Sequence, residues 1–119
     1  MGLTYITLNI ANPAKPKRAL AVKMLVDSGA TLSVLPRAIL DKLGIASHSM
    51  RTFTLANGET IERKVGDAIF IYDGVRAPSL VVFGEQGDNV LLGTVTLESL
   101  GFGIDPIRRK PIPLPMILA

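Results

Sequence analysis

The sequence predicts an all-β domain, and its composition supports this. Short runs rich in Val, Ile and Leu recur along the 119 residues, and eleven glycines and eight prolines separate them. Hydrophobic residues make up 48% of the chain, which is enough to bury a core and too many for a disordered segment. The length suits one domain. We therefore expect a single β domain over residues 1–119, with one or two short helices.

The expected strands follow one another along the whole chain, each bounded by turn residues. They span residues 3–10, 19–26, 53–55, 60–63, 65–72, 78–83 and 90–92. A long Pro/Lys loop at 12–17 is expected between the first two strands. The pair Asn57-Gly58 is the strongest signal for a two-residue hairpin, and the residues at 73–76 predict another hairpin.

Two segments carry helix signals. In the first, Pro36 suits the initial turn, residues 39, 40 and 43 share an apolar face, and Gly44 suits the C-terminal cap. The second, residues 97–101, also ends in Leu-Gly. Because an apolar strand and a loop precede each segment, the order strand, loop, helix, Leu-Gly occurs twice in the chain.

The most informative stretch is Met-Leu-Val-Asp-Ser-Gly-Ala-Thr at residues 24–31. An apolar run ends directly in Asp27, and the chain becomes apolar again after residue 31. A carboxylate flanked by core residues needs a compensating partner, because an isolated buried charge is costly. Ser28 can hydrogen-bond locally, and Gly29 lets a second backbone segment approach closely. These features make Asp27 a candidate functional residue.

The active-site loop of the retropepsin-like aspartic proteases, the single-domain retroviral-type family, resembles this stretch. The matching pattern is two hydrophobic residues followed by Asp27, Ser28, Gly29 and Ala30, where many members carry Thr in place of Ser28. The resemblance spans roughly residues 19–105. It implies an acid-protease barrel with short helices, in which Asp27 is the catalytic acid/base and residues 28–30 complete the loop.

The same resemblance implies roles for two further segments and for the repeated order of elements. The tip of the hairpin after residue 53 would be the flap that closes over substrate, and it consists of Ala56, Asn57, Gly58 and Glu59. The apolar strand before the second helix matches the family's hydrophobic-hydrophobic-Gly, which supports the catalytic loop from beneath, and it consists of Leu91, Leu92 and Gly93. The repeated strand-loop-helix order is similar to the family's pseudo-twofold repeat.

One pair of positions departs from the viral pattern. Viral members often carry an acid at the position of Thr31 and an Arg directly after the second-half glycine, where this chain has Thr94. Those two side chains form a salt bridge in such enzymes. Both positions are Thr here, so we expect the chain to lack this way of bracing a dimer.

Peptide hydrolysis by this route needs two carboxylates that share one proton across a bound water. The chain has one Asp-Ser-Gly, and we expect its other aspartates in helical or loop contexts without the motif: Asp41, Asp67, Asp73, Asp88 and Asp105. The second Asp27 must then come from another copy in a twofold-symmetric homodimer. The resemblance therefore implies a homodimeric aspartic endopeptidase that acts on peptide or protein substrates without a metal or organic cofactor. The alternative is a catalytically silent dimer of the same fold that binds or scaffolds peptides.

The C-terminal tail leaves two arrangements open. Three prolines interrupt its apolar residues, so residues 112–115 must be an edge strand or an extended arm. Residues 116–119 could supply a strand to an intersubunit sheet, as the termini do in retropepsin-like dimers. Alternatively, the tail folds back on its own core.

Other classes of function are disfavoured by the residues available. The chain has no cysteine, and His48 is its single histidine, so thiolate metal sites and Cys nucleophiles are excluded and a Ser/His/Asp site would depend on His48 alone. The net charge is +3, and the basic residues beside prolines (Lys15, Lys17, Arg18, Arg108, Arg109 and Lys110) suggest two solvated loops. Aromatic residues make up only 5% of the chain, which disfavours a base-stacking surface for nucleic acid. A basic β domain that binds nucleic acid through the two Lys/Arg loops stays the second, less favoured alternative to the protease.

The sequence also bears on location. The N-terminus lacks the basic-then-apolar pattern of a signal peptide, and no apolar run approaches the length of a membrane span. Ile6 occupies the position where a myristoylation signal needs Ser or Thr. We therefore expect a cytoplasmic protein that does not bind membranes.

Overall fold

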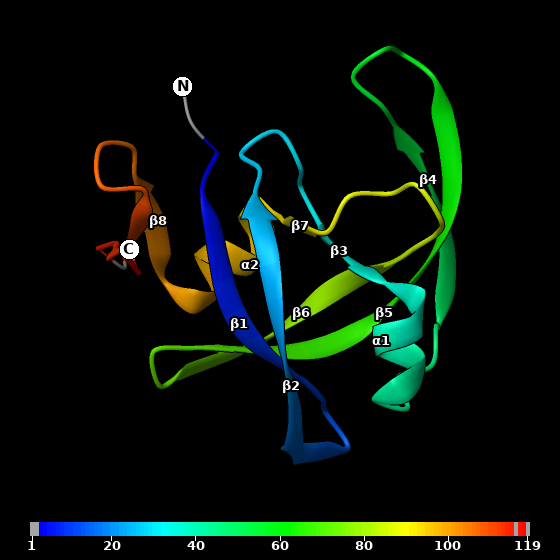
Figure 1. The fold of residues 1–119 in the computed structure, drawn as a ribbon, viewed down its shortest axis with the longest axis horizontal. Coiled ribbons are helices and arrows are strands. Elements are labelled where there is room, and N and C mark those ends of the chain that lie inside the picture. Colours follow the sequence, from blue (N-terminus) through cyan, green and yellow to red (C-terminus); the bar gives the residue numbers. More distant parts are fainter. Residues whose placement is uncertain (1–2, 116, 119) are drawn as a thin grey trace.

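The computed structural model describes residues 3–115, 117 and 118, which contain nine strands and two helices (Figure 1). The strands are β1 (Tyr5–Asn12), β2 (Lys15–Val26), β3 (Ser33–Pro36), β4 (Ser49–Thr54), β5 (Thr60–Tyr72), β6 (Val75–Gly84), β7 (Leu91–Leu92), β8 (Phe102–Asp105) and β9 (Lys110–Pro113). The helices are α1 (Arg37–Lys42) and α2 (Thr94–Leu100). One sheet has the order β1-β2-β7-β3-β6-β5-β4, and β8 and β9 form a separate two-stranded sheet.

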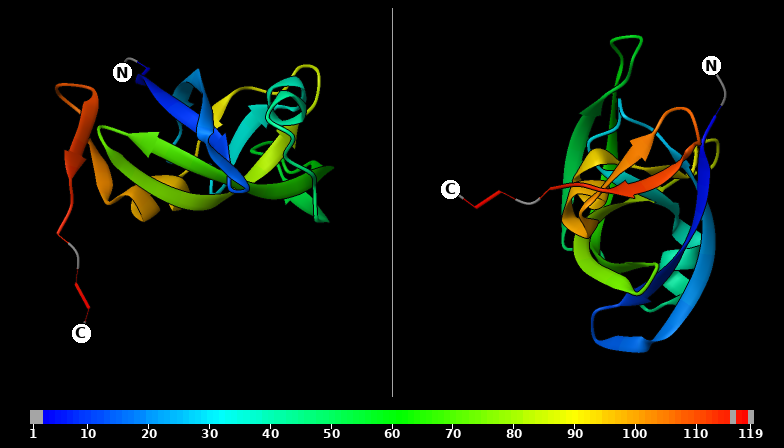
Figure 2. Two further views of the ribbon diagram at one scale, coloured as in Figure 1. Left: turned by 90° about the horizontal axis from the view of Figure 1, so that it is seen from below. Right: turned by 90° about the vertical axis from the view of Figure 1, so that its left-hand side faces the viewer.

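A further pairing between β1 and β5 closes six strands of the large sheet into a ring. In this pairing Ile10 lies opposite Phe70. The fourth strand, β4, stays outside the ring because it pairs with the first part of β5, from Thr60 to Val65, whereas β6 pairs with β5 from Val65 onward. The β4–β5 hairpin therefore projects from the body of the molecule (Figures 1 and 2).

The core follows from the two-residue period of the strands. In β1, Ile6, Leu8 and Ile10 are buried and the residues between them are exposed, because successive side chains of a strand point to opposite faces. The largest completely buried apolar side chains come from both halves of the chain: Phe70, Leu8, Ile10, Met24, Leu35, Leu40 and Leu92. Both helices contribute to this core through their apolar faces.

The predicted strands are all present, but the first hairpin is tighter than expected. The prediction of a long loop at 12–17 is wrong: Pro13 and Ala14 form the turn, and β2 begins at Lys15. The side chains at 15–19 are exposed on both faces of the strand. The apolar pattern therefore gave no sign of this part of β2.

The two predicted hairpins differ in their turns. Asp73 and Gly74 both have positive φ (50° and 77°) and form a two-residue turn between the paired residues 72 and 75. The prediction of a two-residue turn at Asn57-Gly58 is wrong, because five residues separate the paired Thr54 and Thr60. The reason is local: the Asn57 side chain accepts the Glu59 N–H at 2.9 Å, and only Gly58 of this pair has positive φ, at 88°.

Two expectations about the aspartates and strands also need correction. Residues 60–63 and 65–72 belong to one continuous strand, β5, and Asp67 lies within it, not in a loop or helix. Asp105 ends β8 and likewise lies in a strand.

Both predicted helices are present, but the repeated order of elements is only partly matched, because β3 lies between the Asp27 loop and α1, whereas Gly93 alone lies between β7 and α2. Helix α1 begins after Pro36, and Gly44 follows its last turn with φ +74°. Helix α2 begins at Thr94, earlier than predicted, and Gly101 follows it with φ +79°. Glycine suits both positions, because the left-handed conformation strains other residues.

Truncation of the central aromatic side chain tests this description of the core. Phe70→Ala should lower the free energy of unfolding by about 3–5 kcal/mol, because the vacated volume lies in a completely buried site. Val75→Ala, at an exposed position at the start of β6, should change it by less than about 0.5 kcal/mol. Urea denaturation of both variants measures the difference, and equal losses would contradict the assigned core.

Candidate active site

Asp27 lies directly after the last residue of β2, in a tight backbone loop. The Gly29 N–H donates to Asp27 Oδ1 at 2.8 Å, and the Ala30 N–H donates to the Asp27 carbonyl oxygen at 3.1 Å. A Cβ at position 29 would lie only 3.2 Å from that same Oδ1. Asp27 is half-buried, whereas Ser28 and Gly29 are exposed. The Gly29 amide is thus the compensating partner that the sequence requires for this carboxylate.

The short strand β7 lies between the two segments that flank this loop (Figure 1). It runs parallel to β2, with Leu25 opposite Leu91, and antiparallel to β3, with Val34 opposite Leu91. The Asp27 N–H donates to the Leu92 carbonyl oxygen at 3.1 Å. The backbone of β7 therefore holds the loop from both sides.

The residue after β7 has to be glycine. A Cβ on Gly93 would lie 2.5 Å from the Leu32 carbonyl carbon and 2.7 Å from the Thr31 carbonyl oxygen, well inside van der Waals contact. The Gly93 N–H donates to the Ser33 hydroxyl at 2.9 Å. Any side chain at this position would push the 30–33 segment away from β7.

The first turn of α2 donates backbone hydrogen bonds to the loop that carries Asp27. Its N-terminus has no side-chain cap, and the Thr94 N–H donates instead to the Ala30 carbonyl oxygen at 2.9 Å, while the Val95 N–H donates to that of Thr31 at 3.1 Å. These bonds satisfy amides that a helix leaves free at its start. Backbone hydrogen bonds thus join the 30–31 and 94–95 segments, and the two threonines at positions 31 and 94 lie within these segments.

Three buried hydroxyls form a chain behind the loop. The Ser33 Oγ lies 2.6 Å from the Thr96 Oγ1, which lies 3.1 Å from the Ser79 Oγ. Because Ser33 accepts the Gly93 N–H, it can donate to Thr96, Thr96 to Ser79, and Ser79 to the Leu80 carbonyl oxygen at 3.4 Å. Each of these three buried hydroxyls therefore has a hydrogen-bond partner, as buried polar groups require.

A cleft of about 690 Å³ separates Asp27 from the β4–β5 hairpin. The residues that line it are Asp27, Gly29, Ala30, Thr31, Leu32, Val34, Thr52, Phe53, Thr54, Leu55, Ala56, Ile61, Arg63, Val82, Gly87, Asp88, Asn89 and Leu91. Of the residues singled out in the sequence, the cleft brings together Asp27, Gly29, Ala30, Ala56 and Leu91. It does not include Ser28, Asn57, Gly58, Glu59, Leu92 or Gly93.

The hairpin contributes an apolar pair and free backbone donors to the cleft. Phe53 and Ile61 lie opposite each other in the ladder, and both line the cleft. At the tip, the Leu55 and Gly58 amides donate within the turn, at 2.7 and 2.9 Å. Within the described part of the chain, the Ala56 amide has no acceptor, so it can donate to another molecule.

The sequence did not reveal a charged pair in the cleft. Arg63 Nε donates to Asp88 Oδ2 at 2.7 Å, and its Nη2 donates to Asp88 Oδ1 at 3.0 Å. The Arg63 hydrogen bond holds the pKa of the Asp88 carboxyl below its ordinary value. The pair therefore persists below the pH at which an ordinary Asp takes up a proton, and it is lost as the pH falls through the lowered pKa. The partners are 25 positions apart in the sequence, and neither belongs to a motif.

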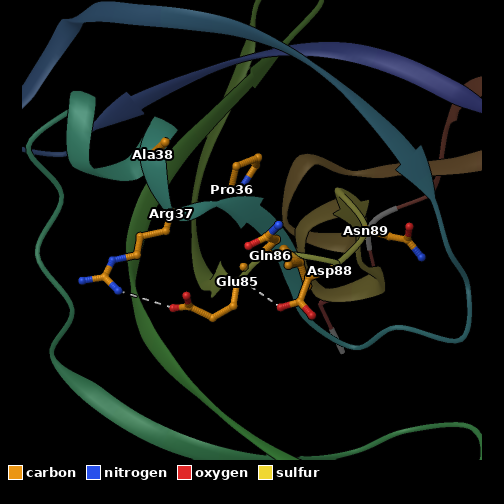
Figure 3. Close-up of a pocket in the computed structure, with 9 residues that line it drawn as sticks. Pro36, Arg37, Ala38, Glu85, Gln86, Asp88 and Asn89 are labelled. Carbon is orange, nitrogen blue, oxygen red and sulfur yellow. Dashed lines mark hydrogen bonds and ion pairs between the residues drawn. The ribbon is translucent and has the colours of Figure 1, made fainter.

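A second, smaller pocket of about 260 Å³ shares Val34, Asp88 and Asn89 with the lining of the cleft (Figure 3). Its lining residues are Val34, Pro36, Arg37, Ala38, Gly84, Glu85, Gln86, Asp88 and Asn89. Figure 3 shows Arg37 directed toward Glu85, with the guanidinium 3.6 Å from the carboxylate. Asp27 does not line this pocket.

The other polar residues that the sequence singled out, His48 and the basic segments, do not line the cleft. His48 is exposed, as expected, and its ring lies 3.1 Å from Asp67 Oδ1 and 3.0 Å from Ser49 Oγ, but none of these residues lines a described pocket with Asp27. Residues 15–18 begin β2, and residues 108–109 lie in the β8–β9 turn.

Across residues 3–115, 117 and 118, no group of three His, Cys, Asp or Glu could hold a metal ion, and no helix is long and apolar enough to cross a membrane.

Comparison with known proteins identifies the family. The profile of the family described as "gag-polyprotein putative aspartyl protease" matches residues 18–99, more than half of the chain. The chain belongs to this family. The match contains the Asp27 loop, the β4–β5 hairpin and Gly93. No curated protein matches the sequence significantly.

Solved structures of retroviral proteases share the fold. The protease of simian foamy virus (mac) superposes with a TM-score of 0.51 at 19% identity, covering 78% of this chain and 92% of the viral one. The EIAV protease in complex with the inhibitor HBY-793 superposes with a TM-score of 0.57, also at 19% identity, covering 84% and 89%. The predicted all-β, retropepsin-like fold is thereby confirmed.

The buried hydroxyl chain yields a stability prediction for this family member. Thr96→Val keeps the side-chain shape but leaves Ser33 and Ser79 without their shared partner, so unfolding should become easier by about 1–3 kcal/mol. The exposed Thr60→Val is the matched control and should change stability by less than about 0.5 kcal/mol. Thermal and urea denaturation measure the stability of both variants. A Thr96→Val variant as stable as the wild type would contradict the stabilising role of the three linked hydroxyls.

Proposed function

We propose that this chain is an aspartic endopeptidase that acts as a homodimer and uses Asp27 from each copy. The observation that carries the proposal is that Asp27 faces a cleft of about 690 Å³ with the β4–β5 hairpin on the opposite side. Membership of a retroviral-type aspartic protease family and the shared fold support it.

The proposed reaction needs two carboxylates and one water. One Asp27 carboxylate takes a proton from the water as it attacks the peptide carbonyl carbon, and the other, protonated Asp27 donates to the carbonyl oxygen. Two carboxylates at about 3 Å cannot both be ionised, so the pair carries one shared proton. Collapse of the tetrahedral intermediate then breaks the C–N bond, and a proton passes to the leaving amine.

A second copy is required because the chain carries one Asp-Ser-Gly motif. The two-stranded β8–β9 sheet offers a surface for it, because it lies outside the large sheet and carries exposed apolar side chains. In and directly after this sheet, the exposed apolar residues are Ile107, Ile112 and Leu114. The terminal segments add Leu3, Tyr5, Ile117 and Leu118. The tail folds back as far as Leu114, whose N–H donates to the Gly101 carbonyl oxygen at 2.8 Å, and Ile117 and Leu118 are almost completely exposed. The predicted strand at 116–119 includes Met116 and Ala119, which lie outside the described residues.

The loop and hairpin residues have distinct proposed roles. Ser28 is exposed and does not line the cleft, so its hydroxyl can bond to the facing loop of the second copy and keep the two aspartates coplanar. Gly29 gives room for substrate backbone, and Ala30 packs beneath. The hairpin tip is the proposed flap, and the free amide of Ala56 can donate to an extended peptide.

The catalytic assignment is tested by removing the shareable proton. Asp27→Asn should lower cleavage of a mixed peptide library at pH 3–7 by roughly a thousandfold or more while leaving fold and dimer intact. Asp73→Asn, an exposed turn residue whose left-handed conformation suits Asn, is the matched control and should cleave like the wild type. Pepstatin should inhibit the wild type. Full activity of Asp27→Asn would refute the mechanism, and a folded wild-type dimer that binds but does not cut peptides would favour the silent binding module.

The role of Ser28 is tested through the dimer. Ser28→Ala should raise the dimer dissociation constant by roughly tenfold, because it removes hydrogen bonds at the symmetry axis. Ser47→Ala, an exposed loop residue, should leave the constant unchanged. Sedimentation equilibrium measures both, and an unchanged constant for Ser28→Ala would argue against the bridging role.

A further inference from the structure

We infer that the Arg63–Asp88 ion pair anchors the base of the β4–β5 hairpin to the 85–88 turn, and that both side chains are positioning residues for the proposed flap. The effect on catalysis rests on the proposed function. The anchoring of the hairpin by the ion pair does not, and it can be tested without measuring cleavage.

The position of Arg63 in β5 marks a boundary. Three inward-facing residues of this strand follow one another: Ile61 lines the cleft, Arg63 reaches Asp88, and Val65 is completely buried in the core. The pairing of β5 with β6 begins at Val65, opposite Val82. Arg63 is therefore the first inward-facing side chain of the projecting hairpin, next to its junction with β6.

Among the side-chain hydrogen bonds of the described residues 50–64, those of the ion pair join the hairpin to the rest of the protein. In the region that the structure describes, every other side-chain hydrogen bond of residues 50–64 stays within the hairpin, between Asn57 and Glu59 or between Arg63 and Glu62. The Arg63–Asp88 contact has two N–H donors and two carboxylate oxygens. Such a bidentate pair fixes orientation as well as distance.

The partner loop is held in one conformation. The Asp88 N–H donates to the Glu85 carbonyl oxygen at 3.0 Å, and the Asp88 Oδ2 accepts the Glu85 N–H at 2.8 Å. Gly87, with φ +92°, completes this turn. Figure 3 shows the Asp88 carboxylate bent back toward the Glu85 backbone. Arg63 therefore binds a carboxylate that its own turn already orients.

The charge of Arg51, a second arginine close to Arg63, also favours the Arg63–Asp88 pair. Arg51 lies directly opposite Arg63 in the β4–β5 ladder, and like charges at such positions destabilise a sheet. Asp88 neutralises Arg63, whose side chain is only 19% exposed, whereas Arg51 is exposed to water. Loss of Asp88 would leave two unbalanced guanidinium groups at the base of the hairpin.

Anchoring at this point affects substrate through the flap. The turn at 85–88 is followed, after Asn89 and Val90, by β7, whose Leu92 carbonyl accepts the Asp27 N–H. The ion pair thus connects the hairpin to the segment that supports the catalytic loop. When the pair is broken, the hairpin tip should spend less time over bound peptide, which weakens binding more than it slows the chemical step.

The experiment compares amide hydrogen exchange and peptide kinetics in four proteins. The variants are Asp88→Asn, Arg63→Gln and the double variant, beside the wild type. Each single change should speed exchange of the amides at 52–61 by roughly tenfold, with the amides of the β1–β5 pairing unchanged. The double variant should exchange no faster than the singles, because both remove one interaction. In peptide cleavage, KM should rise several-fold while kcat changes by less than about twofold.

A control and a rescue complete the test. Glu85→Gln breaks the exposed Arg37–Glu85 pair in the same loop and should leave hairpin exchange and KM at wild-type values. Arg63→Lys keeps the charge without the bidentate geometry and should recover part of the lost protection. Unchanged exchange at 52–61 in Asp88→Asn and Arg63→Gln, or equal acceleration throughout the sheet, would overturn the inference. A wild type that cleaves no peptide would refute the proposed function while the exchange data still decided the anchoring.

Discussion

The insertion of β7 between β2 and β3 is the constraint on which the site depends. A two-residue strand would be marginal by itself, yet its carbonyl at Leu92 accepts the Asp27 N–H, and Leu91 lies opposite residues of both flanking strands. The aspartate therefore has a fixed backbone on each side. The carboxylate needs only the Gly29 amide as a local partner, and it still faces the cleft.

This arrangement explains why small and hydroxylated residues gather behind the loop. The backbone at Gly93 approaches that at residues 31–32 so closely that a side chain would not fit. The close approach buries polar groups, and the hydroxyls of Ser33, Thr96 and Ser79 satisfy them in a continuous chain. Unsatisfied groups at such a depth would be costly.

The two sides of the cleft differ in how they are held. The Asp27 side is joined to the core through three strands and the first turn of α2. The hairpin side is joined through the β5 strand and the Arg63–Asp88 contact. In the proposed function, a firmly held Asp27 loop opposite a less extensively attached hairpin suits a site that admits an extended peptide and then closes over it.

The sequence by itself determined the fold class, the candidate aspartate and the glycine beneath it, because each is recorded locally: alternating apolar residues, the Asp-Ser-Gly pattern, and a short apolar strand ending in Gly93. The turn at Asn57-Gly58 was misjudged because a side-chain bond of Asn57 competes with the two-residue geometry. Only the tertiary structure decided the lining of the cleft and the Arg63–Asp88 contact. Both depend on segments that are distant in the chain, and no spacing within a sequence reveals which distant side chains will meet.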